Sequence, residues 1–212
     1  MTQRAEERYW SRFASSYDID GEYVVGRRIL QLIEEALANE KSPGNAIELG
    51  CGTGYFTKTI ARNASHIVAT DLSKEMLEVA RSRLRELKNI TIQKADCAKI
   101  AFPAERFDSV FLINLLHVID HPSQCLRESY RVLRNEGSVI VVDFTGHRLS
   151  FSKKMKLGFR YLRTWGLPPP GGRNNMSPEE LALLVERAGF RVENVELLQD
   201  GANALYLKGT KQ

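Results

Sequence analysis

Three glycines, Gly50, Gly52 and Gly54, occupy alternate positions directly after the apolar run at 46–49. Glycines at this density let a ligand approach the backbone closely, because no Cβ stands in the way. A triphosphate, a dinucleotide or another nucleoside ligand can bind such a loop, and a tight turn without any ligand is the remaining alternative. The residues around the loop decide among them.

The loop departs from both phosphate-binding patterns. A triphosphate loop needs Lys-Ser or Lys-Thr after its last glycine, and here Tyr55-Phe56 follows. The dinucleotide fingerprint places its third glycine where this chain has Tyr55. Glu48 precedes Gly50 by two residues and would repel a pyrophosphate, whereas it suits a cation. The loop therefore predicts S-adenosylmethionine, which carries an ammonium and a sulfonium.

Polar residues at the ends of the following strands fit the rest of this cofactor. Asp71 can accept hydrogen bonds from both ribose hydroxyls, although it could instead belong to the start of the next helix. Asp96 is placed to meet the adenine amino group, with the Cys97 N–H on a ring nitrogen. Asn114 ends the fourth strand, beside the expected methyl donor.

Alternating strands and helices must position these residues. Helices are expected around 9–13 and over 22–38, 55–63, 73–87 (with Ser73 as N-cap) and 122–134 (stopped by Gly137), and strands over 45–50, 66–71, 89–96, 107–114 and 137–144. This alternation predicts parallel βαβ units in a doubly wound α/β sheet. A helix that opens at Ser177-Pro178 precedes two runs joined around Asp200-Gly201-Ala202, which predicts an antiparallel end of the sheet.

The length fits one domain over 1–212. Within it, N-terminal helices (1–40) are expected over the cofactor, and the segment 145–176 is expected to be a basic, lid-like insertion. Apolar residues make up 43% of the chain and charged residues 26%, which is typical of a globular protein. Without a secretory signal or a long apolar run, a cytoplasmic location is expected. Three cysteines without CxxC spacing indicate neither disulfides nor a zinc site, and no metal is predicted.

Several segments resemble successive motifs of class I S-adenosylmethionine-dependent methyltransferases. They are "AIELGCGTGYF", "VATDLSKEML", "KADCAKIAFPAERFDSV", "NLLHVIDHP" and "RESYRVLRNEGSVIVVDF", together with the N-terminal "WSRFASSYD". The branch that they resemble includes the ubiquinone and menaquinone C-methyltransferases. The resemblance implies a Rossmann-like, seven-stranded, mostly parallel sheet of order 3-2-1-4-5-7-6 with the last strand antiparallel and helices on both faces.

The resemblance also implies how the cofactor is held. Glu48, Gly50, Cys51 and Gly52 would line the methionine part, over which Tyr17 would close, while the ribose and the adenine would contact Asp71, Leu72, Met76, Asp96, Cys97 and Asn114.

Methyl transfer from a sulfonium is an in-line displacement, so positioning supplies much of the catalysis. A general base is needed only for a protonated, weakly nucleophilic acceptor. His117 is the first candidate, followed by His147 and Asp143. Each has an alternative role, since His117 could bond only a backbone carbonyl and Asp143 could simply cap its strand.

The positive charge of the chain is concentrated in one segment. Between Phe144 and Pro178 there are seven lysines or arginines and no acidic residue. Phe151, Met155, Phe159 and Leu162 form one apolar stripe at helical spacing, with Lys153, Lys154, Lys156, Arg160 and Arg163 on the other faces. Such a helix can lie on an anionic membrane through 149–163, line an apolar pocket or pack its stripe on the core.

The same segment indicates the class of acceptor. Pro168–Pro170 and Gly171-Gly172 predict a stiff turn and a hinge of a lid. A lid that carries phenylalanine, tyrosine and tryptophan suits a small apolar or aromatic acceptor, such as a quinone precursor, a lipid or an isoprenoid-like metabolite. Two alternatives stay open: an RNA methyltransferase that stacks a base on Tyr161 or Trp165, and a non-catalytic subunit that activates a partner.

Overall fold

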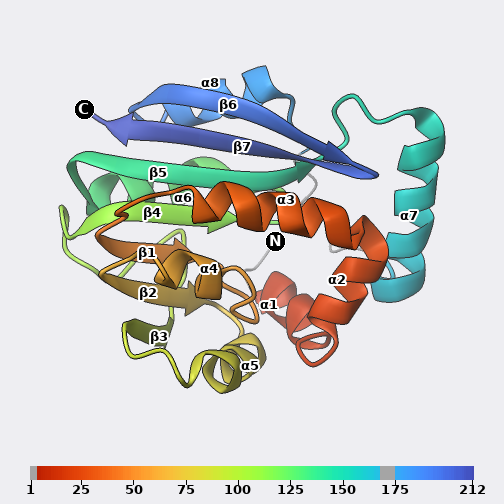
Figure 1. The fold of residues 1–212 in the computed structure, drawn as a ribbon, viewed down its shortest axis with the longest axis horizontal. Helices are drawn as coiled ribbons and strands as arrows, with labels where there is room; N and C mark the ends of the chain where they lie inside the picture. Colours follow the sequence, from red (N-terminus) through yellow and green to blue (C-terminus); the bar gives the residue numbers. More distant parts are fainter. Residues whose placement is uncertain (1–3, 168–174) are drawn as a thin grey trace.

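The computed structural model describes residues 4–167 and 175–212 of the chain. Its centre is a seven-stranded sheet of order β3-β2-β1-β4-β5-β7-β6, as the sequence predicted (Figure 1). The strands are β1 (Asn45–Leu49), β2 (His66–Asp71), β3 (Ile90–Lys94), β4 (Phe107–Ile113), β5 (Leu133–Thr145), β6 (Phe190–Asp200) and β7 (Ala202–Lys211).

Helices cover both faces of the sheet. One face packs against α6 (Pro122–Val132) and α8 (Pro178–Glu186), and the other against α3 (Arg27–Ala38) and α4 (Thr57–Ala61) (Figure 1). Because both faces are covered, the central strands are almost continuously apolar and buried. A further helix, α5 (Lys74–Leu84), connects β2 to β3 and begins at the predicted N-cap Ser73, whose hydroxyl accepts a hydrogen bond from the Met76 amide.

The predicted antiparallel end is confirmed. β5 and β6 both pair with β7 in antiparallel register, and the parallel part of the sheet runs from β3 to β5. Gly201 joins β6 to β7 with a φ of +65°, a conformation that glycine adopts without strain. The helix before this pair opens with the predicted Ser177-Pro178, and Ser177 forms a capping box with Glu180.

Two boundaries differ from the prediction. The helix expected over 22–38 is divided at Gly26, whose φ is +96°, into α2 (Tyr17–Val25) and α3. The prediction that Gly137 stops the helix after β4 is wrong, since α6 ends at Val132 and Gly137 lies within β5. A Cβ on Gly137 would stand 2.8 Å from the Arg134 carbonyl oxygen, so this glycine serves a close backbone approach.

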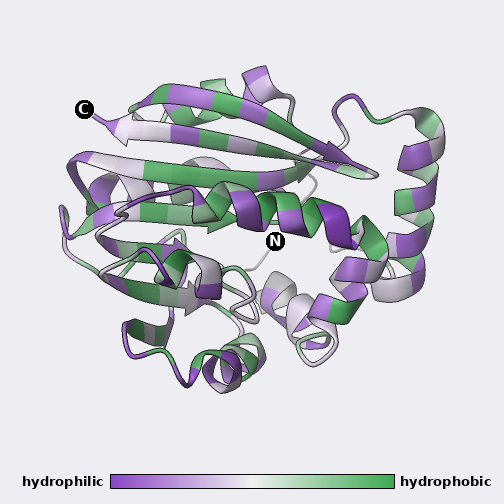
Figure 2. Cartoon of the chain, viewed as in Figure 1, coloured by the Kyte–Doolittle hydropathy of each residue, from purple (hydrophilic) through white to green (hydrophobic). Residues whose placement is uncertain are grey.

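Three helices gather beside the carboxyl ends of the parallel strands: α1 (Arg4–Ser11), α2 and α7 (Phe151–Trp165) (Figure 1). The predicted insertion helix is α7, and hydrophilic and hydrophobic residues alternate along it (Figure 2). The turn and hinge predicted at 168–172 lie outside the described residues. Within the described ranges, no helix is both long and apolar enough to cross a membrane.

Candidate active site

The glycine loop follows β1 and has left-handed backbone conformations at three positions. The φ angles of Gly50, Gly52 and Gly54 are +72°, +53° and +75°. A Cβ on Gly50 would stand 2.7 Å from a Leu115 methyl carbon, and one on Gly54 would stand 2.8 Å from Leu84. A Cβ on Gly52 would meet no atom within 4 Å. Close packing against Leu115 and Leu84 therefore explains why Gly50 and Gly54 have no side chain, whereas the space beside Gly52 is available to a ligand.

Asp71, at the end of β2, holds the glycine loop in place. Its Oδ2 accepts a hydrogen bond of 2.9 Å from the Gly52 amide, and its Oδ1 accepts one of 2.8 Å from the Ser73 amide. Burial raises the pKa of Asp71, and these amide hydrogen bonds oppose that rise. Because each carboxylate oxygen has two lone pairs, Asp71 can also accept hydrogen bonds from ligand hydroxyls.

Glu48, the acidic residue before the loop, is a buried carboxyl group with a neutral partner. Its side chain is 1% exposed, and the Thr57 hydroxyl donates a hydrogen bond of 2.5 Å to its Oε2. Burial raises the pKa of Glu48 to about 7. A cation at this place would favour the ionised carboxylate and relieve the cost of its burial.

A cavity of about 440 Å³ lies against the carboxyl ends of β2, β3 and β4. The structure thereby brings together residues that the sequence predicted from the ends of four separate strands. They are Gly50, Gly52, Asp71, Leu72, Met76, Asp96, Cys97 and Asn114, with Tyr17 from α2.

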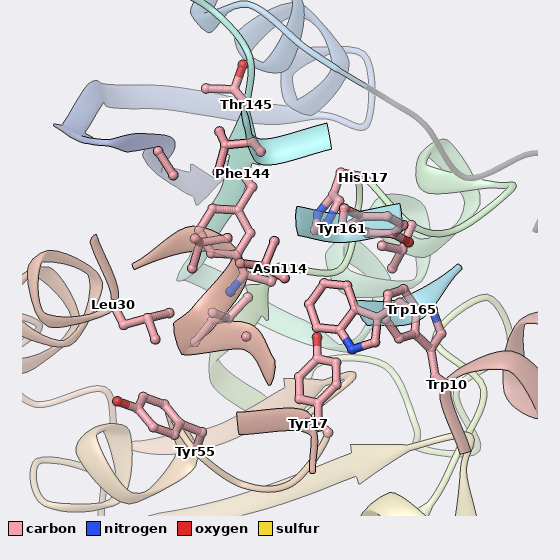
Figure 3. A pocket seen from close by; sticks show the side chains of 18 of the residues that line it. Trp10, Tyr17, Leu30, Tyr55, Asn114, His117, Phe144, Thr145, Tyr161 and Trp165 are labelled. Atoms are coloured by element: carbon pink, nitrogen blue, oxygen red, sulfur yellow. The ribbon is translucent and has the colours of Figure 1, made fainter. Parts of the chain in front are cut away.

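A second, larger cavity of about 750 Å³ adjoins the first. Residues that line both cavities include Trp10, Tyr17, Gly50 and Asn114, and they mark where the two meet. Figure 3 shows Trp10, Tyr17 and Asn114 in the lining of the larger cavity. Glu48 and Cys51 also line the larger cavity, whose remaining walls are mostly apolar. Aromatic rings contribute much of this lining: Trp10, Tyr17, Tyr55, Phe56, Phe144, Tyr161 and Trp165.

Aromatic side chains from three helices form the wall nearest this junction. Tyr17 stacks on Trp165 at 5.8 Å between ring centroids, and Trp10 contacts both rings edge-on. Burial raises the pKa of Tyr17, so its phenol stays neutral. The buried Trp10 Nε1, Trp165 Nε1 and Asn114 Oδ1 have no hydrogen-bond partner in the part of the chain that the structure describes. This wall therefore offers two donors and one acceptor.

The N-terminal helices are tied to the glycine loop by contacts that sequence reasoning missed. Asp18 accepts a hydrogen bond of 2.6 Å from the Thr53 hydroxyl and forms an ion pair with Arg83 of α5. Arg83 also donates to the Thr53 carbonyl oxygen at 3.0 Å. The available signal was Asp18 itself, which follows Tyr17 in the N-terminal motif.

Two of the three candidate catalytic residues form a pair. His117 Nδ1 hydrogen-bonds Asp143 Oδ1, and the His117 amide donates to Asp143 Oδ2 at 2.8 Å. Asp143 lies at the end of β5 and is only 2% exposed, whereas His117 lines the larger cavity. With Asp143 ionised and the imidazole of His117 neutral, Nδ1 carries the proton and donates a hydrogen bond to the carboxylate, and Nε2 is an acceptor.

The third candidate, His147, lies elsewhere. It is not among the lining residues of either cavity described above. Its amide donates to the Thr145 hydroxyl at 2.9 Å, and its carbonyl oxygen accepts from the Asn203 side chain at 2.8 Å. The geometry thus separates two histidines that the sequence left as alternatives.

Comparisons with known proteins agree with this architecture. Residues 47–141 match a family model described as "Methyltransferase domain". A demethylmenaquinone methyltransferase of Tropheryma whipplei is 27% identical over 76% of this chain and 72% of its own length. Another, from Thermotoga maritima, is 25% identical over 90% of both chains. The solved structure of a SAM-dependent methyltransferase from Aquifex aeolicus is 19% identical, with a TM-score of 0.66 over 93% of this chain and 97% of that one, a likeness in fold.

Proposed function

Because this chain is a class I S-adenosylmethionine-dependent methyltransferase, we propose that it methylates a small apolar or aromatic acceptor bound in the larger cavity. The observation that carries the proposal is the cavity itself, about 750 Å³ with mainly apolar and aromatic walls. Both relatives described above are named for methylation of demethylmenaquinone, which favours a quinone precursor as the acceptor.

The residues of the smaller cavity, together with Glu48 and Cys51 of the adjoining larger cavity, fit the cofactor. A buried carboxyl at Glu48 suits its cationic methionine end, the space at Gly52 admits it close to the backbone, and Asn114 Oδ1 provides an unused acceptor. Bound S-adenosylmethionine supplies an electrophilic methyl group beside a positive sulfur. Its proposed contacts are Glu48, Gly50, Cys51, Gly52 and Tyr17 for the methionine part, Asp71 and Leu72 for the ribose, and Met76, Asp96, Cys97 and Asn114 for the adenine side and the last wall.

His117 is the proposed general base. Its Nε2 would take the proton that the acceptor loses as the acceptor's nucleophilic atom gains the methyl group. Asp143 would act as a positioning residue, because it holds the imidazole by Nδ1 and stabilises the imidazolium that forms. The aromatic wall of Trp10, Tyr17 and Trp165 would exclude water from the junction of the two cavities.

Transfer of labelled methyl groups from S-adenosylmethionine to an apolar metabolite extract tests the proposal. The His117→Asn variant should bind the cofactor normally and lose about 10²- to 10⁴-fold in kcat, and Asp143→Asn should shift the pH dependence of the rate. His147→Asn is the matched control and should keep its activity. Label that enters RNA rather than the extract, or a rate that depends on His147 and not on His117, would contradict it.

A further inference from the structure

The helix α7 has two apolar faces, and only one of them is used by the cavity. Leu157, Tyr161 and Trp165 line the larger cavity. The predicted stripe is exposed to solvent: Phe151, Met155, Phe159 and Leu162 are 79%, 58%, 65% and 49% exposed, and of these four only Leu162 also lines the cavity. We call these four side chains the outer stripe. Of the three roles expected for this stripe, the prediction that it packs on the core is therefore wrong.

Further exposed apolar residues lie next to the outer stripe. α2 packs beside α7 (Figure 1). It carries the exposed Ile19 and Tyr23, and the Arg160 guanidinium stacks over the Tyr23 ring at 5.4 Å. Leu162 and Leu167 are exposed and also line the larger cavity. The exposed apolar surface thus reaches the mouth of that cavity.

The charge beside the outer stripe is positive. Five lysines or arginines lie on α7, which has no acidic residue, and the whole chain has a net charge of +4, so the rest of the chain is slightly acidic. None of the ion pairs found within the described ranges involves a cation of α7. These charges are therefore available to an anionic partner.

We propose that the outer stripe and its flanking cations dock the protein on an anionic lipid bilayer. A helix with large apolar side chains on one side and lysine or arginine beside them lies in the membrane interface, with the apolar side in the acyl region and the cations at the headgroups. The benefit of such docking rests on the proposed function, because it assumes that the methyl acceptor is apolar. An apolar acceptor could enter the larger cavity past Leu162 and Leu167 without crossing water.

The chemistry of the surface disfavours two other occupants. Two copies that met through α7 would bring two sets of five positive charges together. A single-stranded RNA could stack bases on Phe151 and Phe159, but the exposed aliphatic side chains of Met155 and Leu162 in the same stripe suit acyl chains rather than bases.

Co-sedimentation of the full chain with vesicles tests the proposal. The protein should bind vesicles of phosphatidylcholine mixed with phosphatidylglycerol and should stay in solution with phosphatidylcholine alone. The double variant Met155→Gln/Phe159→Gln should lower the partition coefficient roughly tenfold or more. Lys153→Glu/Lys156→Glu should lower it roughly twentyfold or more. Leu183→Gln is the matched control, because Leu183 is 46% exposed but lies on α8, and it should bind like the wild type.

Calorimetric titration of the same variants with S-adenosylmethionine separates the two proposals. Unchanged cofactor binding with lost vesicle binding supports docking through α7. Cofactor binding without any vesicle binding by the wild type overturns the docking while the proposed function stands, and vesicle binding without cofactor binding does the reverse. Docking is also overturned by RNA binding that is lost in Lys153→Glu/Lys156→Glu while vesicles stay unbound, or by a dimer that Met155→Gln/Phe159→Gln dissociates.

Discussion

The Glu48→Gln variant should separate two opposite effects of one buried carboxyl group. In the free protein, burial raises the pKa of Glu48 to about 7, so ionising it costs folding free energy. In the complex, the same carboxylate is proposed to face the cationic end of the cofactor. Glutamine keeps the size of the side chain and can still accept the hydrogen bond from Thr57, but it has no charge. The variant should therefore be more stable at high pH and bind the cofactor more weakly.

The size of the stability effect follows from proton linkage. A carboxyl group that titrates near 4.5 in the unfolded chain and near 7 in the fold stabilises the protein below pH 4.5 and loses that contribution as the pH rises through 7. At roughly 1.4 kcal/mol per pKa unit, the wild type should lose about 2–3 kcal/mol relative to Glu48→Gln between pH 5 and pH 8. Urea unfolding of both proteins at the two pH values measures this difference.

Cofactor binding at about pH 6.5 tests the other effect, because the cofactor's α-amino group, which titrates at about 7.7–8.0, is still protonated there. Much of Glu48 is also protonated in the free protein at this pH, and a cation beside it should expel the proton. Calorimetric titration in buffers of different ionisation enthalpy should show proton release by the wild type and none by Glu48→Gln. The variant should bind about 10- to 100-fold more weakly, the loss of a charge-assisted interaction of about 1.5–3 kcal/mol.

An exposed glutamate provides the control. Glu186→Gln on α8 removes one negative charge at the surface and should change neither the pH dependence of stability nor proton release. Two results would refute the reasoning about Glu48: wild-type binding enthalpies that do not depend on the buffer, or a Glu48→Gln variant that binds the cofactor as tightly as the wild type.

Two further substitutions test the loop. Asp71→Ala should weaken cofactor binding by about 1–3 kcal/mol in the same titration, because it removes the proposed ribose contact and the partner of the Gly52 amide; unchanged affinity would exclude the ribose assignment. Gly54→Ala should lower the free energy of unfolding by about 1–3 kcal/mol, because its φ is +75° and its Cβ would lie 2.8 Å from Leu84. Gly21→Ala, in a helix with open space around the new Cβ, should raise it by about 0.4–1 kcal/mol, and equal effects of the two substitutions on thermal unfolding would contradict this account.

Features encoded by short segments were predictable from the sequence. The apolar runs of the central strands are buried on both faces, so they lack the alternation that an exposed sheet would show. Ser73 and Ser177 cap their helices through side-chain bonds to the backbone only three residues ahead. Gly137 was misinterpreted because glycine ends helices and also permits close backbone approach, and only the contact with β4 distinguishes the two.

Features that depend on distant pairs were not predictable. Asp143 was a candidate base in its own right, and its proposed role as a positioning residue for His117 rests on a contact between residues on separate elements. In the wall of Trp10, Tyr17 and Trp165, residues of the N-terminal segment contact a residue of the insertion. These residues lie about 150 positions apart in the sequence, so no local pattern predicts their contact. The orientation of α7 was ambiguous for the same reason, because both its faces are apolar.

The two faces of α7 explain why the insertion is at once aromatic and basic. Tyr161 and Trp165 line the larger cavity on the inner side, where the proposed methyl transfer would benefit from a dry wall. An acceptor that suits such a wall is itself poorly soluble in water, so the route by which it arrives matters as much as the site. The exposed Phe159 and the lysines and arginines of α7 place an apolar, positively charged surface at the cavity mouth, where a bilayer that dissolves the acceptor could supply it. The same helix can thus exclude water from the reaction and bring the enzyme to its substrate.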